Sequence, residues 1–143
     1  MTRKVHPKVR ELFEAWLQSS PFALATGLTL EEMEPERAVV AMPFSEALTT
    51  FGDVVHGGAI ATLLDVAAVA AAWAGVTDES AATGATVSSS VNYVRAARGS
   101  DLTATGRVSR RAKRLCFCDV EVRDDGDALV AQGIVTYKVA AGG

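Results

Sequence analysis

The chain has 143 residues, of which 49% are hydrophobic and 22% are charged. These proportions are typical of a soluble globular protein, and they exclude a disordered or fibrous chain. We therefore expect one domain over residues 1–143, and the formal net charge of −3 argues against general nucleic-acid binding.

The positive charges are nevertheless concentrated, because seven of the fourteen Lys and Arg residues lie between positions 95 and 114. The two cysteines, Cys116 and Cys118, are two residues apart in a predicted strand, so they point to one face and suit a disulfide poorly. Reduced thiols and a cytoplasmic location are therefore expected. Two Cys and two His that are widely spaced give little support for a metal site, so none is expected.

The first predicted element is a short amphipathic helix that begins near Pro7 and ends near Ser20. Two strands, at 28–33 and 37–43, follow and are joined by a turn at 34–36. A loop over 45–55 leads to the next helix. The apolar residues of the first helix recur at helical spacing, and they are Val9, Leu12, Phe13, Trp16 and Leu17.

A long helix is predicted over about 57–75, and from Gly57 to Val76 its only charged residue is Asp65. The run is long enough to span a membrane, but its alanine content, its central acid and the strands after it favour a buried helix. Burying an unpaired carboxylate costs several kcal/mol, and no cation lies three or four positions away. Asp65 therefore either has a distant partner or serves chemistry.

Four further strands are predicted at 85–94, 101–111, 115–123 and 128–139, with a tight turn at 124–127 between the last two. A helix that is apolar on nearly every side must be surrounded by other elements. We therefore expect an α+β hotdog fold, in which a six-stranded antiparallel sheet wraps around the long helix beside a short N-terminal helix. Its open edge or face favours dimerisation.

His56-Gly57-Gly58, with Asp65 eight residues after the first glycine, resembles the signature of hotdog-fold acyl-CoA thioesterases of the phenylacetate-catabolism (PaaI-like) family. The resemblance covers about residues 28–139. It implies hydrolysis of an acyl-CoA thioester to a carboxylic acid and free coenzyme A, without a metal or other cofactor.

The chemistry of these residues agrees with that activity. Free N–H groups at a helix start bind a developing oxyanion, and Gly57 has no Cβ to block a carbonyl. We predict that the Gly57 N–H is the oxyanion donor and that Asp65 is either the general base or the nucleophile. The two groups are eight residues, or about 12 Å, apart along one helix. One carbonyl cannot reach both, so we expect a composite site in a homodimer or a dimer of dimers.

Other positions follow from the resemblance. Thr50 stands where the family commonly has an Asn, and Thr86 matches a hydroxyl residue that could hold the attacking water. His56 is counted with the catalytic residues, although positioning the loop is its expected role. The basic turn suits the phosphates of coenzyme A. The residues expected to bind the substrate or coenzyme A are Gly58, Ser88, Tyr93, Arg110, Arg111, Lys113, Arg114 and Lys138.

Structural alternatives remain open for these residues. Asp65 could pair with a distant arginine, the basic turn could be a solvated hairpin end, and Thr86 or Tyr93 could be ordinary strand residues. The first helix could pack in the core, form a subunit contact or cover the acyl pocket. Trp73 could line that pocket or fill the core.

Two other function classes also remain open, namely a non-catalytic acyl-CoA-binding module and a hotdog enoyl-CoA hydratase or dehydratase. An aryl group and a medium or long chain fit the sequence equally well.

Overall fold

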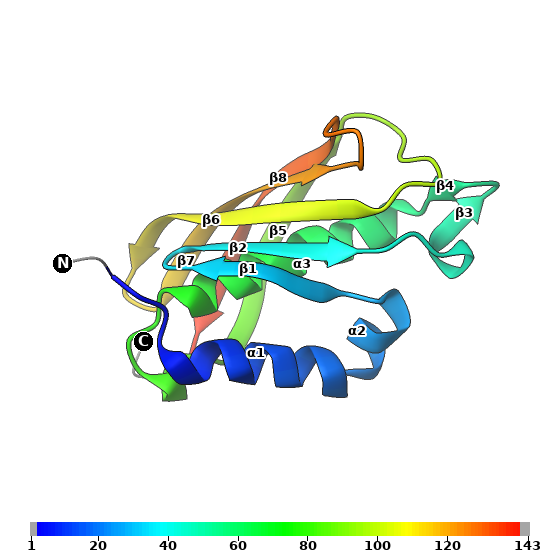
Figure 1. Ribbon diagram of the computed structural model, residues 1–143. Coiled ribbons are helices and arrows are strands. Elements are labelled where there is room, and N and C mark those ends of the chain that lie inside the picture. The colour runs from blue at the N-terminus through cyan, green and yellow to red at the C-terminus, as the bar shows by residue number, and fades with distance from the viewer. Residues whose placement is uncertain (1–2, 141–143) are drawn as a thin grey trace.

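Six antiparallel strands curl around one long helix in the computed structural model, which describes residues 3–140 (Figure 1). The sheet order is β1-β2-β6-β7-β8-β5. Its strands are β1 (Thr29–Glu34), β2 (Arg37–Met42), β5 (Gly84–Tyr93), β6 (Leu102–Ala112), β7 (Leu115–Arg123) and β8 (Leu129–Val139). The predicted hotdog fold is therefore confirmed, with strand ends shifted by about one residue.

The central helix α3 (Gly57–Ala74) lies in the concave face of the sheet and contacts β2, β6, β7 and β8 (Figure 1). Small side chains let the sheet approach closely. A Cβ added to Gly106 of β6 would lie 2.5 Å from the carbonyl oxygen of Ala67. By length and composition, α3 is the one helix among residues 3–140 that could cross a membrane, but most of it is buried inside the fold, as in the core helix of a soluble protein.

The N-terminal helix α1 (Pro7–Ser19) packs beside β1 and α3 (Figure 1). Val9, Phe13 and Leu17 are buried in the core, whereas Leu12 and Trp16 remain partly exposed. The predicted amphipathic helix is thus confirmed, and two of its five apolar residues lie at its margin.

Two short features are absent from the sequence prediction. A second helix, α2 (Pro21–Thr26), follows α1 directly because Ser20 caps it and Pro21 begins it. The expected loop at 45–55 is structured. It contains a 3₁₀ turn, η1 (Glu46–Leu48), and the two-stranded sheet of β3 (Thr49–Phe51) and β4 (Val54–Val55). A second 3₁₀ turn, η2 (Glu79–Ala81), precedes β5.

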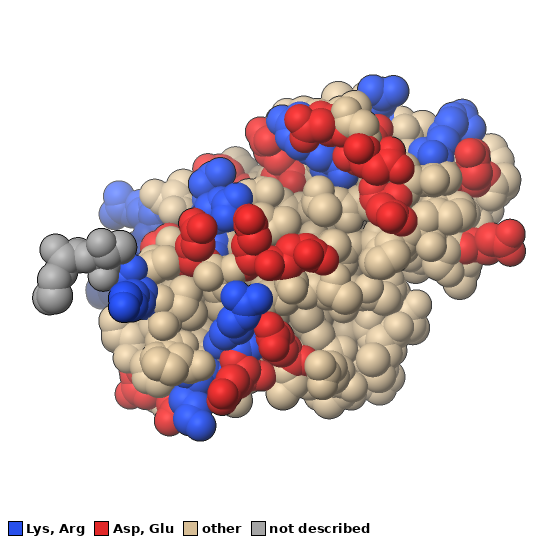
Figure 2. Space-filling model, viewed as in Figure 1, with Lys and Arg blue, Asp and Glu red and all other residues tan. Residues whose placement is uncertain are grey.

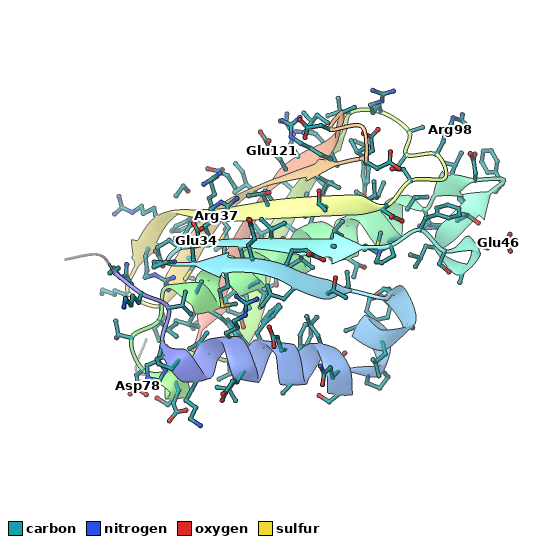
Figure 3. All side chains as sticks on the ribbon, viewed as in Figure 1. Glu34, Arg37, Glu46, Asp78, Arg98 and Glu121 are labelled. Atoms are coloured by element: carbon teal, nitrogen blue, oxygen red, sulfur yellow. The ribbon has the colours of Figure 1, made fainter. Side chains whose placement is uncertain are left out.

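The two faces of the main sheet differ in character. The inner face packs on α3 and carries the core. The outer face carries charges of both signs, and ion pairs link Arg37 to Glu34 and Arg123 to Glu121 (Figures 2 and 3). The outer face is therefore solvated, and the core lies between the inner face and α3.

The edge strand β5 leaves one side of its backbone unpaired, because within residues 3–140 its one neighbour in the sheet is β8. Nine of its ten residues are exposed. A long exposed edge is a template for pairing with another strand.

Candidate active site

The start of α3 forms an amide-rich turn whose geometry His56 fixes. His56 is the N-cap residue, and its Nδ1 accepts a hydrogen bond from the Gly58 N–H at 2.7 Å. Its own backbone N–H donates to the Leu48 carbonyl at 2.7 Å, which ties the turn to η1. His56 therefore has a positioning role, and the Gly58 N–H is already occupied.

The Gly57 N–H is the remaining donor at this helix start. No acceptor for it is found within residues 3–140, whereas the Ala59 N–H returns to the His56 carbonyl at 2.9 Å. Tyr93, at the end of β5, donates its hydroxyl to the Gly57 carbonyl at 2.9 Å and covers the glycine. The backbone at Gly57 is thus fixed from both sides, and its N–H is the group available to an oxyanion.

Asp65 lies two turns further along α3, partly exposed, beside the start of β5. The Thr86 hydroxyl donates to its Oδ1 at 2.7 Å. Within the described part of the chain no cation forms a salt bridge with Asp65. The alternative in which a distant arginine neutralises Asp65 is therefore wrong within residues 3–140, where the side-chain hydrogen bond to the acid comes from Thr86.

A cavity of about 280 Å³ opens beside this pair. Tyr137 of β8 lines it, and the Trp73 Nε1 donates to the Tyr137 hydroxyl at 3.0 Å. Burial raises the pKa of Tyr137, while the Trp73 hydrogen bond opposes this and the charge of Asp65 adds to it. Tyr137 therefore remains a neutral phenol near the carboxylate. Larger hollows lie between α1 and β1 and on the outer face, but none contains Asp65 or Gly57.

The basic hairpin between β6 and β7 lies at the C-terminal end of α3, opposite the β3–β4 end of the molecule (Figure 1). Arg110, Lys113 and Arg114 are exposed there. Lys138 of β8 is exposed too, and it stands opposite Leu115 in the β7 register. These four exposed cations lie on β6, on the β6–β7 turn and on β8 opposite Leu115, and we call them the hairpin cluster.

Arg111 differs from these four residues. Its guanidinium makes two hydrogen bonds to Glu36, at 2.7 and 3.2 Å, and a third to the Ala72 carbonyl at 2.8 Å. It therefore satisfies the end of α3, where a cation also complements the helix dipole. The guanidinium of Arg111 is thus held by the fold, unlike those of the exposed Arg110 and Arg114.

Ser88 lies on the other side of β5 from Thr86. Thr86 stands opposite the buried Tyr137 on the inner face, but a β-bulge follows, and Ser88 stands opposite Thr136. Ser88 therefore faces outward, away from Asp65. Thr50 is exposed on β3, near the start of α3, and no hydrogen bond of its hydroxyl is found within residues 3–140.

Three aromatic residues at the cavity were not assigned to the site from the sequence. The sequence allows Trp73 either to line the pocket or to fill the core, and it allows Trp16 to pack in the core, form a subunit contact or cover the pocket. It gives no indication of Tyr137. The i, i+4, i+8 spacing of Asp65, Val69 and Trp73 is the signal that places Trp73 on the face of the acid. No local signal marks Tyr137, since its place depends on β8 pairing with β5.

The cysteines and possible metal ligands add no further centre. Cys116 and Cys118 are buried free thiols, and burial raises the pKa of Cys118 to about 12. Among residues 3–140, no group of three or more His, Cys, Asp or Glu side chains is placed to hold a metal.

A long helix wrapped by a six-stranded antiparallel sheet is the hotdog fold, and within residues 3–140 the helix has one free amide, that of Gly57, at its start and a carboxylate in its middle; the class of protein is a hotdog-fold thioester hydrolase. The chain belongs to the thioesterase superfamily, whose family description matches residues 52–131, more than half of its length.

Relatives extend the similarity beyond that segment. Human acyl-coenzyme A thioesterase 13 is 29% identical over 128 residues, covering 87% of this chain and 89% of the relative. The medium/long-chain acyl-CoA thioesterase YigI of Escherichia coli is 28% identical over 141 residues, covering 88% and 90%. The E. coli PaaI protein from the phenylacetic acid degradation operon has the same fold, with a TM-score of 0.79 at 22% identity over 94% of this chain and 95% of that one.

Proposed function

We propose that this protein hydrolyses an acyl-CoA thioester, using Asp65 of one copy and the Gly57 N–H of a second copy. The observation that carries the proposal is the state of Asp65. It is a helix carboxylate held by one hydroxyl, without a cationic partner in residues 3–140, at the mouth of a cavity. An acid left unneutralised in an apolar helix is better explained by chemistry than by stability.

The reaction uses few groups. Asp65 takes a proton from water as the water oxygen adds to the thioester carbon, and the Gly57 N–H receives the developing oxyanion. Collapse of the tetrahedral intermediate breaks the C–S bond, and the sulfur leaves with the proton as coenzyme A thiol. The alternative is attack by Asp65 itself, giving an anhydride that water then opens. Single turnover in ¹⁸O-labelled water tests the second route, because label enters Asp65 only when an anhydride forms and water opens it at the Asp65 carbonyl carbon.

The proposal of two copies rests on distance and on the free sheet edge. Gly57 and Asp65 are about 12 Å apart on one helix, which exceeds the reach of one carbonyl. Two-fold pairing of β5 with its counterpart would satisfy the exposed edge and set two α3 helices antiparallel. The Gly57 of one copy would then lie beside the Asp65 of the other, and two such dimers could form a tetramer.

Coenzyme A is the proposed carrier of the acyl group. From Asp65 to Ala74, at the end of α3 beside the hairpin cluster, the helix rises about 14 Å over nine residues. This distance suits the phosphates of coenzyme A at the end of its extended pantetheine arm. Tyr93 and Gly58 would border the carbonyl at the other copy. The names of the human and E. coli relatives support an acyl-CoA substrate. Thr50 would offer a hydroxyl near the thioester, and we propose a cytoplasmic location.

The test is release of free thiol from aryl- and fatty-acyl-CoAs by the purified protein. We expect turnover by the native protein and a loss of about 10³-fold in kcat for Asp65→Asn, with the fold and coenzyme A binding retained. Thr86→Val removes the hydroxyl that donates to Asp65, and Thr49→Val, which removes a threonine hydroxyl elsewhere, is its matched control. Binding without hydrolysis, or hydration of an enoyl-CoA, would contradict the proposal.

A further inference from the structure

We propose that the ion pair between Glu36 and Arg111 positions the hairpin cluster for coenzyme A, without itself touching the substrate. This inference rests on the proposed function and names two positioning residues for it. The pair lies at one end of the molecule, where the β1–β2 turn and the β6–β7 hairpin meet the end of α3 (Figure 1). Side-chain contacts of Arg111 join these three elements.

Each nitrogen of the Arg111 guanidinium has an acceptor. Nε and Nη2 donate to the two carboxylate oxygens of Glu36, at 3.2 and 2.7 Å. Nη2 also donates to the Ala72 carbonyl of α3 at 2.8 Å, and Nη1 donates to the Cys116 sulfur of β7 at 2.9 Å. The planar fork of a guanidinium makes two parallel bonds to a carboxylate, which a lysine cannot reproduce. The orientation of Arg111 is therefore fixed from three sides.

Glu36 has a backbone conformation that glycine would adopt more readily. Its φ is 63°, in the left-handed region that residues with a Cβ rarely occupy. Strained residues of this kind persist where the surrounding structure holds them, and they cluster at functional sites. The Glu36 carbonyl also accepts the Val108 N–H of β6 at 2.9 Å. The backbone thus attaches the turn to β6, and the carboxylate is held against Arg111 despite the local strain.

The pair is enclosed enough to keep one geometry. The side chains of Arg111 and Glu36 are 22% and 26% exposed. Gly75, directly after α3, leaves room for them, because a Cβ there would overlap the Glu36 carboxylate. The Gly75 carbonyl in turn accepts a hydrogen bond from Arg3 at 2.7 Å. Partly buried pairs are screened less than exposed ones, so this pair orders the elements that it joins.

The hairpin cluster is attached directly to this pair. Arg110 precedes Arg111, and a β-bulge between Val108 and Arg110 leaves Arg110 exposed while Arg111 turns inward. Fixing Arg111 therefore fixes the backbone of the cluster relative to α3, the helix that carries Asp65. The phosphates and the thioester of one substrate have to meet the cluster and Asp65 at the same time. A hairpin that shifts keeps its charges but loses this fit.

The experiment compares two substrates that share an acyl group, octanoyl-CoA and octanoyl-pantetheine, which lacks the phosphates. Arg111→Lys keeps the charge but cannot make the two parallel bonds to Glu36. We expect about a tenfold rise in KM for octanoyl-CoA with kcat nearly unchanged, and no change for octanoyl-pantetheine. Glu36→Gln, which keeps the size of the side chain, should change KM in the same direction. A pair that served stability alone would not separate the two substrates.

Arg123→Lys is the matched control. Arg123 also pairs with a glutamate, Glu121, at 2.9 Å, but it does so at the opposite end of β7. Its KM values should equal those of the native protein. Arg110→Ala supplies a second check. Because Arg111 acts through the cluster, Arg111→Lys should raise KM for octanoyl-CoA by a smaller factor in the Arg110→Ala protein than in the native protein.

The outcomes are distinct. Equal changes in KM for both substrates, or a lower stability of Arg111→Lys with unchanged KM for octanoyl-CoA, would show a purely structural pair and overturn the inference. An undiminished effect of Arg111→Lys in the Arg110→Ala protein would overturn it too. Thermal unfolding identifies a variant that does not fold, and the KM values of Glu36→Gln then decide.

Titration calorimetry with coenzyme A keeps the two proposals apart. A native protein that binds coenzyme A but hydrolyses neither thioester would refute the proposed function. In that case a higher Kd for coenzyme A in Arg111→Lys would still support the positioning role, and an unchanged Kd would overturn it. A native protein that does not bind coenzyme A would overturn both.

Discussion

A mixed dimer offers a direct test of the composite site, using one defect in each half. Gly57→Pro removes the proposed oxyanion donor but suits the first position of a helix. His56 already has extended backbone angles, φ −60° and ψ 135°, which a following proline favours. A Cβ at Gly57 would come no closer than 3.4 Å to the Tyr93 ring, an ordinary contact. Asp65→Asn supplies the second defect.

The expected activities follow from counting sites. Each variant alone has two defective sites per dimer, and loss of one oxyanion donor costs about 10²–10³ in kcat. A dimer of the two variants pairs an intact Gly57 with an intact Asp65 in one site and both defects in the other. It should therefore recover about half of the native activity.

The assay uses two affinity tags to isolate the mixed dimer after co-expression, followed by thiol release from a hydrolysed acyl-CoA. A mixture of separately purified variants that cannot exchange subunits is the control. Activity of the mixed dimer no greater than the mean of the two single variants would refute the composite site, as would a protein that is monomeric at assay concentrations.

Three further predictions concern the scaffold and the hairpin. Arg111→Ala should lower the free energy of unfolding by about 2 kcal/mol in urea titrations, because it leaves the half-buried Glu36 carboxylate unpaired. Arg110→Ala should leave stability unchanged and raise KM for the acyl-CoA. Equal effects of the two substitutions on stability would contradict the structural role of Arg111. Gly106→Ala should cost about 1–3 kcal/mol by pushing β6 away from the Ala67 carbonyl, measured in the same way, and a neutral result would contradict that contact. Burial raises the pKa of Cys118 to about 12 from an ordinary 9.0. The unfolded state therefore loses the thiol proton first as the pH rises, and the stability of the fold should fall between pH 9 and 12. In thermal melts over this range Cys118→Ala should lose stability less steeply, and an equal dependence of stability on pH in both proteins would refute the role of this thiol.

The sequence predicts well those features that depend on a regular period. The apolar run of α3, the alternation in the last strands and the turn at 124–127 each carry a local signal, and the structure has all of them. The resemblance marked Thr86 as a hydroxyl residue that could hold the attacking water, but it did not indicate the hydrogen bond of Thr86 to Asp65. By contrast, α2 is too short for a helical period, so only its capping residues indicate it.

Ser88 and Arg111 both follow β-bulges, and each faces the opposite way from what simple alternation predicts. In β5 the bulge between Thr86 and Ser88 turns Ser88 outward, although two residues of spacing would place both on one face. In β6 the bulge between Val108 and Arg110 turns Arg111 inward, opposite the buried Cys116. One extra residue reverses the alternation of every later side chain. A charge cluster read from the sequence therefore cannot tell which arginine faces solvent.

Asp65 has a further consequence for stability. The fold provides one hydroxyl donor to the carboxylate and, within residues 3–140, no salt bridge that would offset the cost of burying it. Asp65→Asn keeps an oxygen for Thr86 to donate to, and we expect its free energy of unfolding to equal or exceed that of the native protein, as is common where a site is kept for activity. Urea titration of the two proteins at neutral pH measures this, with Thr86→Val as the variant that removes the donor. A loss greater than about 2 kcal/mol in Asp65→Asn would mean that the carboxylate is structural. Its lack of a cationic partner could then no longer be taken as a sign of catalysis.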